Sequence, residues 1–148
     1  MLLYNLSSRD MKNNSVKAIM TKDVVCISPE QYLLDVKHIY ENKKFHHHIP
    51  VVENGRLVGM VSLIDFMYNI GGAGIKDDNK VYRELMVKDI MTKNPFYLTV
   101  DATIEDVSNV LAKGYYHAVP ILNNEKIVGI VSTADIIKLF LNTVSIQN

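Results

Sequence analysis

The sequence has a single cysteine and no excess of charge of either sign. The first excludes an internal disulfide, and the second argues against several classes of partner. Cys26 has no partner for an internal disulfide, which fits a reducing compartment. Sixteen basic side chains balance sixteen acidic ones, which argues against a nucleic acid or an anionic membrane as the main partner. No apolar run approaches the roughly 20 residues that span a bilayer, and Met1–Leu6 is too short for the apolar core of a signal peptide. We therefore expect a soluble, cytoplasmic protein.

Catalytic motifs are also missing. No serine, histidine and acid occur in the context of a nucleophile elbow, and a single cysteine cannot give the usual Cys and His spacing of a zinc site. The adjacent carboxylates of Asp77 and Asp78 lie in a predicted loop without a partner base. We therefore expect no enzymatic activity, and we assign no catalytic residue and no metal ligand.

What the chain does contain is an internal repeat. Val16–Lys22 and Val87–Lys93 are identical at six of seven positions. An apolar run with one glycine, followed by a serine and by an aspartate three residues later, occurs as Val58–Asp65 and again as Val128–Asp135. Because a unit of half this length would be marginal alone, we expect the two repeats to pack together. The predicted organisation is an N-terminal arm at 1–15, a first repeat at 16–72, a linker at 73–86 and a second repeat at 87–145.

Each repeat predicts the order strand, helix, strand, strand, helix, and hence an α+β fold. Residues 24–27 are β-branched and apolar, which predicts a short strand. Ser28, Pro29 and Gln31 predict that a helix starts directly afterwards, with Ser28 and Gln31 in a capping box. The apolar residues that follow recur at helical spacing.

The second part of each repeat predicts a hairpin and a closing helix. Asn54-Gly55 predicts a tight turn between strands 49–52 and 57–61, and Asn123-Asn124 is expected to do the same in the second repeat. The closing helices are predicted at 62–70 and 132–141. Gly71–Gly74 predicts a helix end and a flexible linker, since no Gly-Lys-Ser/Thr follows to make a phosphate loop.

Three motifs, each present twice, resemble one known family. They are the Ile-Met-Thr opening, the strand of His47–Val51 with its counterpart His117–Ile121, and the Gly-x-x-Ser-x-x-Asp close. Together they resemble the cystathionine-β-synthase (CBS) domain, and two tandem copies resemble the paired unit called a Bateman module. The resemblance implies two β-α-β-β-α repeats packed pseudo-symmetrically through their sheets. It also implies clefts between the repeats that bind AMP, ADP, ATP, S-adenosylmethionine or a similar adenosyl compound, and a homodimer of such pairs.

The closing motif supplies the main candidate ligands, Asp65 and Asp135. A carboxylate at the start of a helix can accept hydrogen bonds from both hydroxyls of a ribose, and the resemblance implies that role here. Ser62 and Ser132 precede these aspartates by one turn, where a hydroxyl and free N–H groups favour an anion such as phosphate. The alternative is that each Ser-x-x-Asp is only a helix capping box.

Two histidines match the family's phosphate-contacting His-Arg pair. His47 and His117 stand at the histidine position, whereas the arginine position holds His48 in one repeat and Ala118 in the other. The whole sequence has only three arginines, and arginine is the preferred clamp for phosphate, so an AMP-like ligand is favoured over ATP. A metal site at residues 46–48 is an alternative, although adjacent histidines on a strand do not converge on one ion.

Further candidates come from the edges of the expected clefts. Lys22 and Lys93 follow the Met-Thr openings and could neutralise a phosphate, or could be solvated charges at a strand end. Ile27, Ile49 and Val119 are candidates for the apolar wall of an adenine slot, with plain core packing as the alternative.

These observations predict a regulatory module that binds an adenosyl compound and responds by a conformational shift. No cofactor is required beyond that ligand. The alternative is a dimeric scaffold with empty clefts, in which the Ser-x-x-Asp motifs are caps only. In either case a regulated partner protein remains to be identified.

Overall fold

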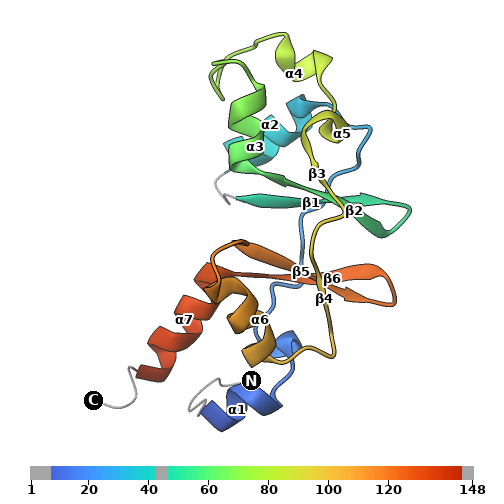
Figure 1. Cartoon of the computed structure of the whole chain (residues 1–148). Helices are drawn as coiled ribbons and strands as arrows, with labels where there is room; N and C mark the ends of the chain where they lie inside the picture. The colour runs from blue at the N-terminus through green and yellow to red at the C-terminus, as the bar shows by residue number, and fades with distance from the viewer. Residues whose placement is uncertain (1–7, 43–46, 145–148) are drawn as a thin grey trace. The chain divides into compact units, whose positions relative to one another are not determined.

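The computed structural model describes residues 8–42 and 47–144, and these fold into two compact units (Figure 1). Among these residues, the first-repeat unit lies between Val25 and Pro95, and the second-repeat unit is formed by 8–24 together with 96–144. Each unit combines a β-hairpin with helices, so the α+β fold expected from the sequence is confirmed. Within the described residues, no helix is long and apolar enough to cross a membrane.

The described residues of the first-repeat unit form four helices and three strands. In chain order they are α2 (Leu33–Glu41), β1 (His48–Glu53), β2 (Arg56–Ser62), α3 (Leu63–Asn69), α4 (Val81–Glu84), α5 (Val87–Ile90) and β3 (Thr92–Lys93). Strand β2 pairs antiparallel with β1 on one side and with β3 on the other. The helices cover a core whose fully buried members include Leu33, Val36, Ile49, Val51, Val61, Phe66 and Tyr82.

The second-repeat unit has the same plan with a longer closing helix. Its elements are α1 (Ser8–Asn13), the 3₁₀ turn η1 (Val16–Ala18), β4 (Leu98–Thr99), α6 (Ile104–Ala112), β5 (Ala118–Asn123), β6 (Lys126–Ser132) and α7 (Thr133–Val144). Strand β5 pairs parallel with β4 and antiparallel with β6. The core buries Val16, Val107, Leu111, Val119, Ile121 and Val131.

The opening segment of each repeat folds into the unit of the other repeat. Strand β3, which opens the second repeat, pairs with β2 at Gly59 and Met60 in the first-repeat unit. Thr21, which opens the first repeat, exchanges backbone hydrogen bonds of 2.9 and 3.0 Å with Ile130 in the second-repeat unit. The boundaries drawn from the sequence describe the repeat along the chain, and the compact units differ from them by this exchange.

The first helix of the first repeat begins later than the sequence predicts. The Ser28 N–H donates to Gln31 Oε1 at 2.9 Å, which is half of the expected capping box, but this contact closes a turn and α2 begins only at Leu33. The Gln31 carbonyl, which a helix would use internally, accepts the N–H of Val87 at 2.8 Å. The chain that follows α4 therefore competes with the first turn of the predicted helix.

The strand predicted at 24–27 is reduced to one bridge. Ile27 pairs parallel with Val51, donating to Pro50 O at 3.0 Å and accepting from Val52 N at 2.8 Å. Its counterpart β4 is only two residues long. The sequence predicted a strand here, and only Ile27 of the predicted residues pairs with another strand in this way.

Both hairpin turns use residues with positive φ, and the second lies one residue later than predicted. Asn54 and Gly55 have φ of 52° and 79°, as an Asn-Gly turn requires. In the second repeat the corresponding residues are Asn124 and Glu125, with φ of 49° and 66°, because β5 extends to Asn123. The predicted Asn123-Asn124 turn is therefore wrong by one position.

The segment after α3, where the glycines predicted a helix end and a flexible linker, contains turns with internal hydrogen bonds. Gly71 and Gly72 have φ of 60° and 82° and end the helix, as expected. Beyond them the Asp77 carboxylate accepts the N–H groups of Gly74 and Asn79 at 2.6 and 3.0 Å. The segment then forms the short helix α4 before it enters the second repeat.

Candidate functional site

The N-terminus of α3 carries a complete capping box between Ser62 and Asp65. The Asp65 N–H donates to Ser62 Oγ at 3.0 Å, and Asp65 Oδ2 accepts from the Ser62 N–H at 3.1 Å and from the Ser62 hydroxyl at 2.7 Å. Because β2 runs directly into α3, the last residue of the strand is also the N-cap of the helix. The strand thus fixes where the carboxylate stands.

Helix α7 repeats this arrangement. Asp135 Oδ2 accepts from the Ser132 N–H at 2.8 Å and from the Ser132 hydroxyl at 3.0 Å, and the Asp135 N–H donates to Ser132 Oγ at 3.3 Å. The two caps therefore match in every donor and acceptor, as the repeated sequence motif predicts. The capping alternative raised for these motifs is confirmed in its geometry.

The caps use one carboxylate oxygen and leave the other available. Among the described residues, no hydrogen bond reaches Oδ1 of Asp65 or Asp135, and both side chains are half-buried rather than covered. Each serine hydroxyl already donates its proton to the aspartate, so it has none left for a phosphate while the cap is intact. The geometry therefore favours the aspartates over the serines as direct ligands of a bound molecule.

The histidines enter the same neighbourhood through their main chain. The His47 carbonyl accepts the N–H of Leu63, the first residue of α3, at 2.8 Å. The His117 carbonyl accepts the corresponding Thr133 N–H at 3.0 Å. The start of the hairpin and the start of the closing helix therefore lie side by side in each unit, and both histidine side chains are exposed there.

The lysines reach these units by the exchange of opening segments. Lys93 lies in the first-repeat unit opposite Gly59, three residues before Ser62 on β2 and so about 10 Å away along the strand. Lys22 lies in the second-repeat unit, directly after the Thr21 pairing. Each unit therefore holds one of the two candidate lysines, one of the two candidate histidines and one Ser–Asp cap. Among the described residues, no hydrogen bond or ion pair joins the lysine to the cap.

The apolar candidates lie in the cores. Ile27 is 3% exposed, and Ile49 and Val119 are fully buried. Ile27 and Ile49 pack in the core of the first-repeat unit, and Val119 packs in that of the second-repeat unit. These positions agree with the core-packing alternative, and a role as an adenine wall stays a prediction.

One residue near the site was not found from the sequence. Tyr40 lies on α2 with a nearly buried side chain, and burial raises the pKa of its hydroxyl, with a further rise from the charge of Asp65. Helical spacing marked Tyr40 only as an apolar position, so nothing in the sequence pointed to this proximity.

The metal alternative gains no support from the described residues. In residues 8–42 and 47–144, no group of three or more His, Cys, Asp or Glu side chains is arranged to hold an ion. His46 lies outside the described residues, so the hypothesis of a site at 46–48 is not tested.

Comparison with known proteins identifies the class of protein that this fold and these paired caps define. The CBS domain family model matches residues 16–72 and 87–142, so the chain belongs to the CBS domain family, as a tandem pair. It is 35% identical over 124 residues to the uncharacterized protein MJ0188 of Methanocaldococcus jannaschii. That match covers 83% of this chain but only 43% of MJ0188. It is also 29% identical over 123 residues to the CBS domain-containing protein YhcV of Bacillus subtilis, covering 83% of each chain.

Solved structures of CBS domain pairs share the fold. CBSX2 in complex with AMP matches with a TM-score of 0.73 at 22% identity, covering 86% of this chain and 97% of that one. The CBS domain pair of MJ0100, in complex with 5′-methylthioadenosine and S-adenosylmethionine, matches with a TM-score of 0.70 at 23% identity, covering 86% and 95%. AcuB of Vibrio cholerae matches with a TM-score of 0.74 at 21% identity, covering 90% and 94%.

Proposed function

We propose that this chain is a non-catalytic regulatory module that binds an adenosyl compound at one or both of its Ser–Asp caps. The observation that carries the proposal is the duplicated carboxylate, held rigidly by its cap and with Oδ1 left to accept further hydrogen bonds. The complexes of CBSX2 with AMP and of MJ0100 with adenosyl compounds support this ligand class.

In this proposal Asp65 and Asp135 accept hydrogen bonds from the two ribose hydroxyls. A preorganised carboxylate is a strong acceptor, because hydrogen bonds to charged groups are worth more than those between neutral groups. His47 or His117, with Lys93 or Lys22, would face the phosphate end. With few arginines and with Ala118 at one arginine position, the chain suits the low charge of AMP better than that of ATP. The ligand changes the conformation only by its difference in affinity between two states.

We expect AMP to raise the melting temperature of this protein. At 100 times its dissociation constant, a ligand of the folded state adds about 2.7 kcal/mol to the free energy of unfolding. For a chain of this length that corresponds to a rise of roughly 5–10 °C. The measurement is a thermal-shift series with AMP, ADP, ATP and S-adenosylmethionine, with GMP as the matched control for phosphate and ribose. No rise with any adenosyl compound would contradict the proposal and favour the empty scaffold.

The homodimer is part of the same proposal, and exposed apolar stripes on the two closing helices favour it. Residues at i, i+3 and i+4 form one stripe on α3 and one on α7, each member at least half-exposed: Ile64, Met67, Tyr68, Ile137, Phe140 and Leu141. An isologous dimer uses the same patch on both copies. Contiguous apolar surface of this kind is typical of interfaces.

We expect the wild-type chain to sediment as a dimer and the variant Met67→Lys/Phe140→Lys to sediment as a monomer. A charge on each stripe would have to be desolvated in the interface without a partner. Analytical ultracentrifugation measures the mass directly. Tyr115→Lys is the matched control, because Tyr115 is 83% exposed and lies off both helices. A wild-type monomer, or a variant that still dimerises, would contradict this assignment.

A further inference from the structure

A row of three aromatic rings braces the helix that carries Asp65. Tyr40 on α2 meets Phe66 edge to face, with ring centroids 5.1 Å apart, and Phe66 stacks on Tyr82 of α4 at 6.0 Å. Phe66 directly follows Asp65 and is fully buried. The Phe66 ring, next to Asp65, is therefore held on both sides. Helix α2 of the repeat contacts it on one side, and α4 contacts it on the other, in the segment that connects the repeats (73–86, the connecting segment).

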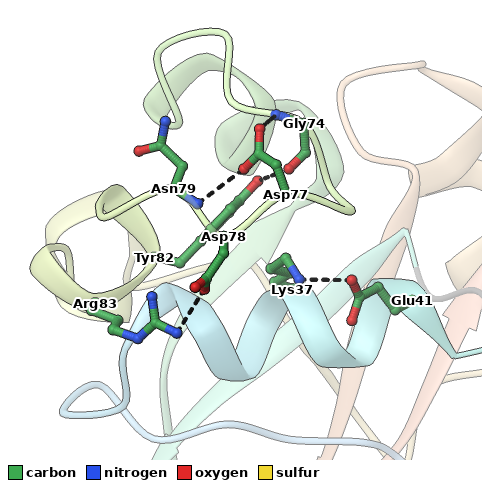
Figure 2. Close-up of polar contacts among 8 residues, drawn as sticks. All are labelled: Lys37, Glu41, Gly74, Asp77, Asp78, Asn79, Tyr82 and Arg83. Carbon is green, nitrogen blue, oxygen red and sulfur yellow. Dashed lines mark hydrogen bonds and ion pairs between the residues drawn. The ribbon is translucent and has the colours of Figure 1, made fainter.

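Tyr82 is itself anchored from several directions, as Figure 2 shows. Its side chain is fully buried, and its hydroxyl donates to the Gly74 carbonyl at 2.6 Å. The Lys37 ammonium lies 5.5 Å from the centre of the ring and forms an ion pair of 2.7 Å with Glu41. Burial raises the pKa of the Tyr82 hydroxyl, and the charges of Asp77 and Glu41 raise it further, so the hydroxyl stays a donor at neutral pH.

The chain around Tyr82 is fastened to the same unit. Asp77 holds the turn at Gly74, and Arg83 pairs with Asp78 at 2.6 Å (Figure 2). After α4, the Leu85 carbonyl accepts the N–H of Leu33 at 2.9 Å. The connecting segment therefore forms part of the first-repeat unit and leads through α5 to Lys93 on β3.

In the described part of the second-repeat unit, the positions that match the three rings hold aliphatic side chains. Leu111 stands at the position of Tyr40, and Ile136 stands at that of Phe66. The counterpart of the connecting segment is α1, which precedes the first repeat: the Ile104 N–H donates to the Asn14 carbonyl at 3.0 Å, as the Leu33 N–H donates to that of Leu85. Met11 stands there at the position of Tyr82. The stacked ring pair in that unit, Phe96 and Tyr116, lies outside its helices, before β4 and before β5. Asp135 therefore has the same cap as Asp65 but, among the residues that the structure describes, no row of rings behind it.

We infer that Tyr82 is a positioning residue for Asp65, and that it makes the cap of the first-repeat unit the tighter of two unequal adenosyl sites. This inference rests on the proposed function. A site whose supporting side chains are already fixed loses less conformational freedom when the ligand binds, so it binds more tightly for the same contacts. The row of rings thereby gives the two repeats different roles, although their ligand motifs match.

Calorimetric titration with AMP tests the inference in two single-site backgrounds, which are variants that keep only one of the two capped aspartates. Asp135→Ala leaves the braced site and Asp65→Ala leaves the unbraced one, and we expect the former to bind AMP about tenfold more tightly. Adding Tyr82→Leu should weaken the braced site by about tenfold and leave the other within about twofold. Tyr82→Phe keeps the ring row and should change affinity less than Tyr82→Leu. Tyr115→Leu is the control for loss of an exposed tyrosine.

Hydrogen exchange gives a second readout that needs no ligand. Tyr82→Leu should speed exchange of the Asp65 amide, which donates to Ser62, and leave the Asp135 amide unchanged. Equal affinities of the two single-site backgrounds would overturn the inference while the proposed function stands, and this comparison needs no Tyr82 variant. An equal effect of Tyr82→Leu on both sites would also overturn it. Failure of the wild-type chain to bind any adenosyl compound would overturn the proposed function and this inference with it.

Discussion

The double variant Asp65→Ala/Asp135→Ala is expected to lose at least about 100-fold in affinity for AMP, because a hydrogen bond to a charged group is worth about 1.5–3 kcal/mol and each site loses two. The free Oδ1 atoms and the cap that holds each carboxylate in place are the basis of this expectation. Isothermal titration with AMP on the wild-type and variant chains measures the effect. The single variants show whether the loss divides between the two sites.

A third capping box supplies a matched control. Asp106 Oδ2 accepts from the Thr103 N–H at 2.8 Å, and the Asp106 N–H donates to Thr103 Oγ1 at 3.1 Å, at the start of α6. Asp106→Ala should therefore cost about 1 kcal/mol of stability, as each cap does, but leave AMP affinity unchanged. If Asp106→Ala weakened AMP binding as much as the double variant, the loss would reflect stability and not contact with the ribose.

The variant Gly129→Ala is expected to destabilise the protein by about 2–3 kcal/mol, since overpacking in a filled core costs about 1–3 kcal/mol. A Cβ added at Gly129 would lie 2.7 Å from Met20 Cγ and 3.1 Å from Met20 Cβ. The Met20 backbone is fixed by the neighbouring Thr21 pairing to Ile130, so the side chain cannot simply withdraw. For a chain of this length the loss corresponds to a fall in melting temperature of roughly 5–10 °C.

The opposing methionine allows the cause to be tested. Met20→Ala removes the two nearest atoms that the new Cβ would meet, Sδ and Cγ, and keeps only the Met20 Cβ at 3.1 Å, so the double variant Gly129→Ala/Met20→Ala should be more stable than the sum of the single effects predicts. Urea denaturation of the four chains gives this coupling energy. Gly59→Ala is the parallel case, with Met91 Sδ 2.5 Å and the Thr92 carbonyl oxygen 3.1 Å from the added carbon. Additive effects of the two substitutions would show that the contact does not explain why glycine stands at position 129.

Local signals in the sequence identified most of the elements and both caps. Asn54-Gly55 located a turn because asparagine and glycine are the residues that most readily adopt the positive φ that such a turn requires. Ser62 and Asp65 located a helix start because a capping box needs only residues three apart. Signals of this kind hold wherever the interacting residues are close along the chain.

The features that sequence did not predict depend on distant contacts. The start of α2 moved to Leu33 because Val87 takes the carbonyl of Gln31 from more than fifty residues away. The sequence could not predict the exchange of opening segments, because Met20 and Met91 lie in identical Ile-Met-Thr-Lys motifs. Either motif could therefore pair with the strands of either repeat, and only the fold shows which pairing occurs. Tyr82 in the connecting segment gave no motif, and only the fold places its ring against Phe66.

The central claim is that the capped aspartates hold a ribose, and removing the ribose hydroxyls from the ligand tests it most directly. The measurement is calorimetric titration of the wild-type chain and of Asp65→Ala/Asp135→Ala with AMP and with 2′,3′-dideoxy-AMP. We predict that the wild-type chain binds AMP at least about 100-fold more tightly than the dideoxy compound, and that the double variant shows a difference below about threefold. Equal affinity of the wild-type chain for the two compounds would contradict the account.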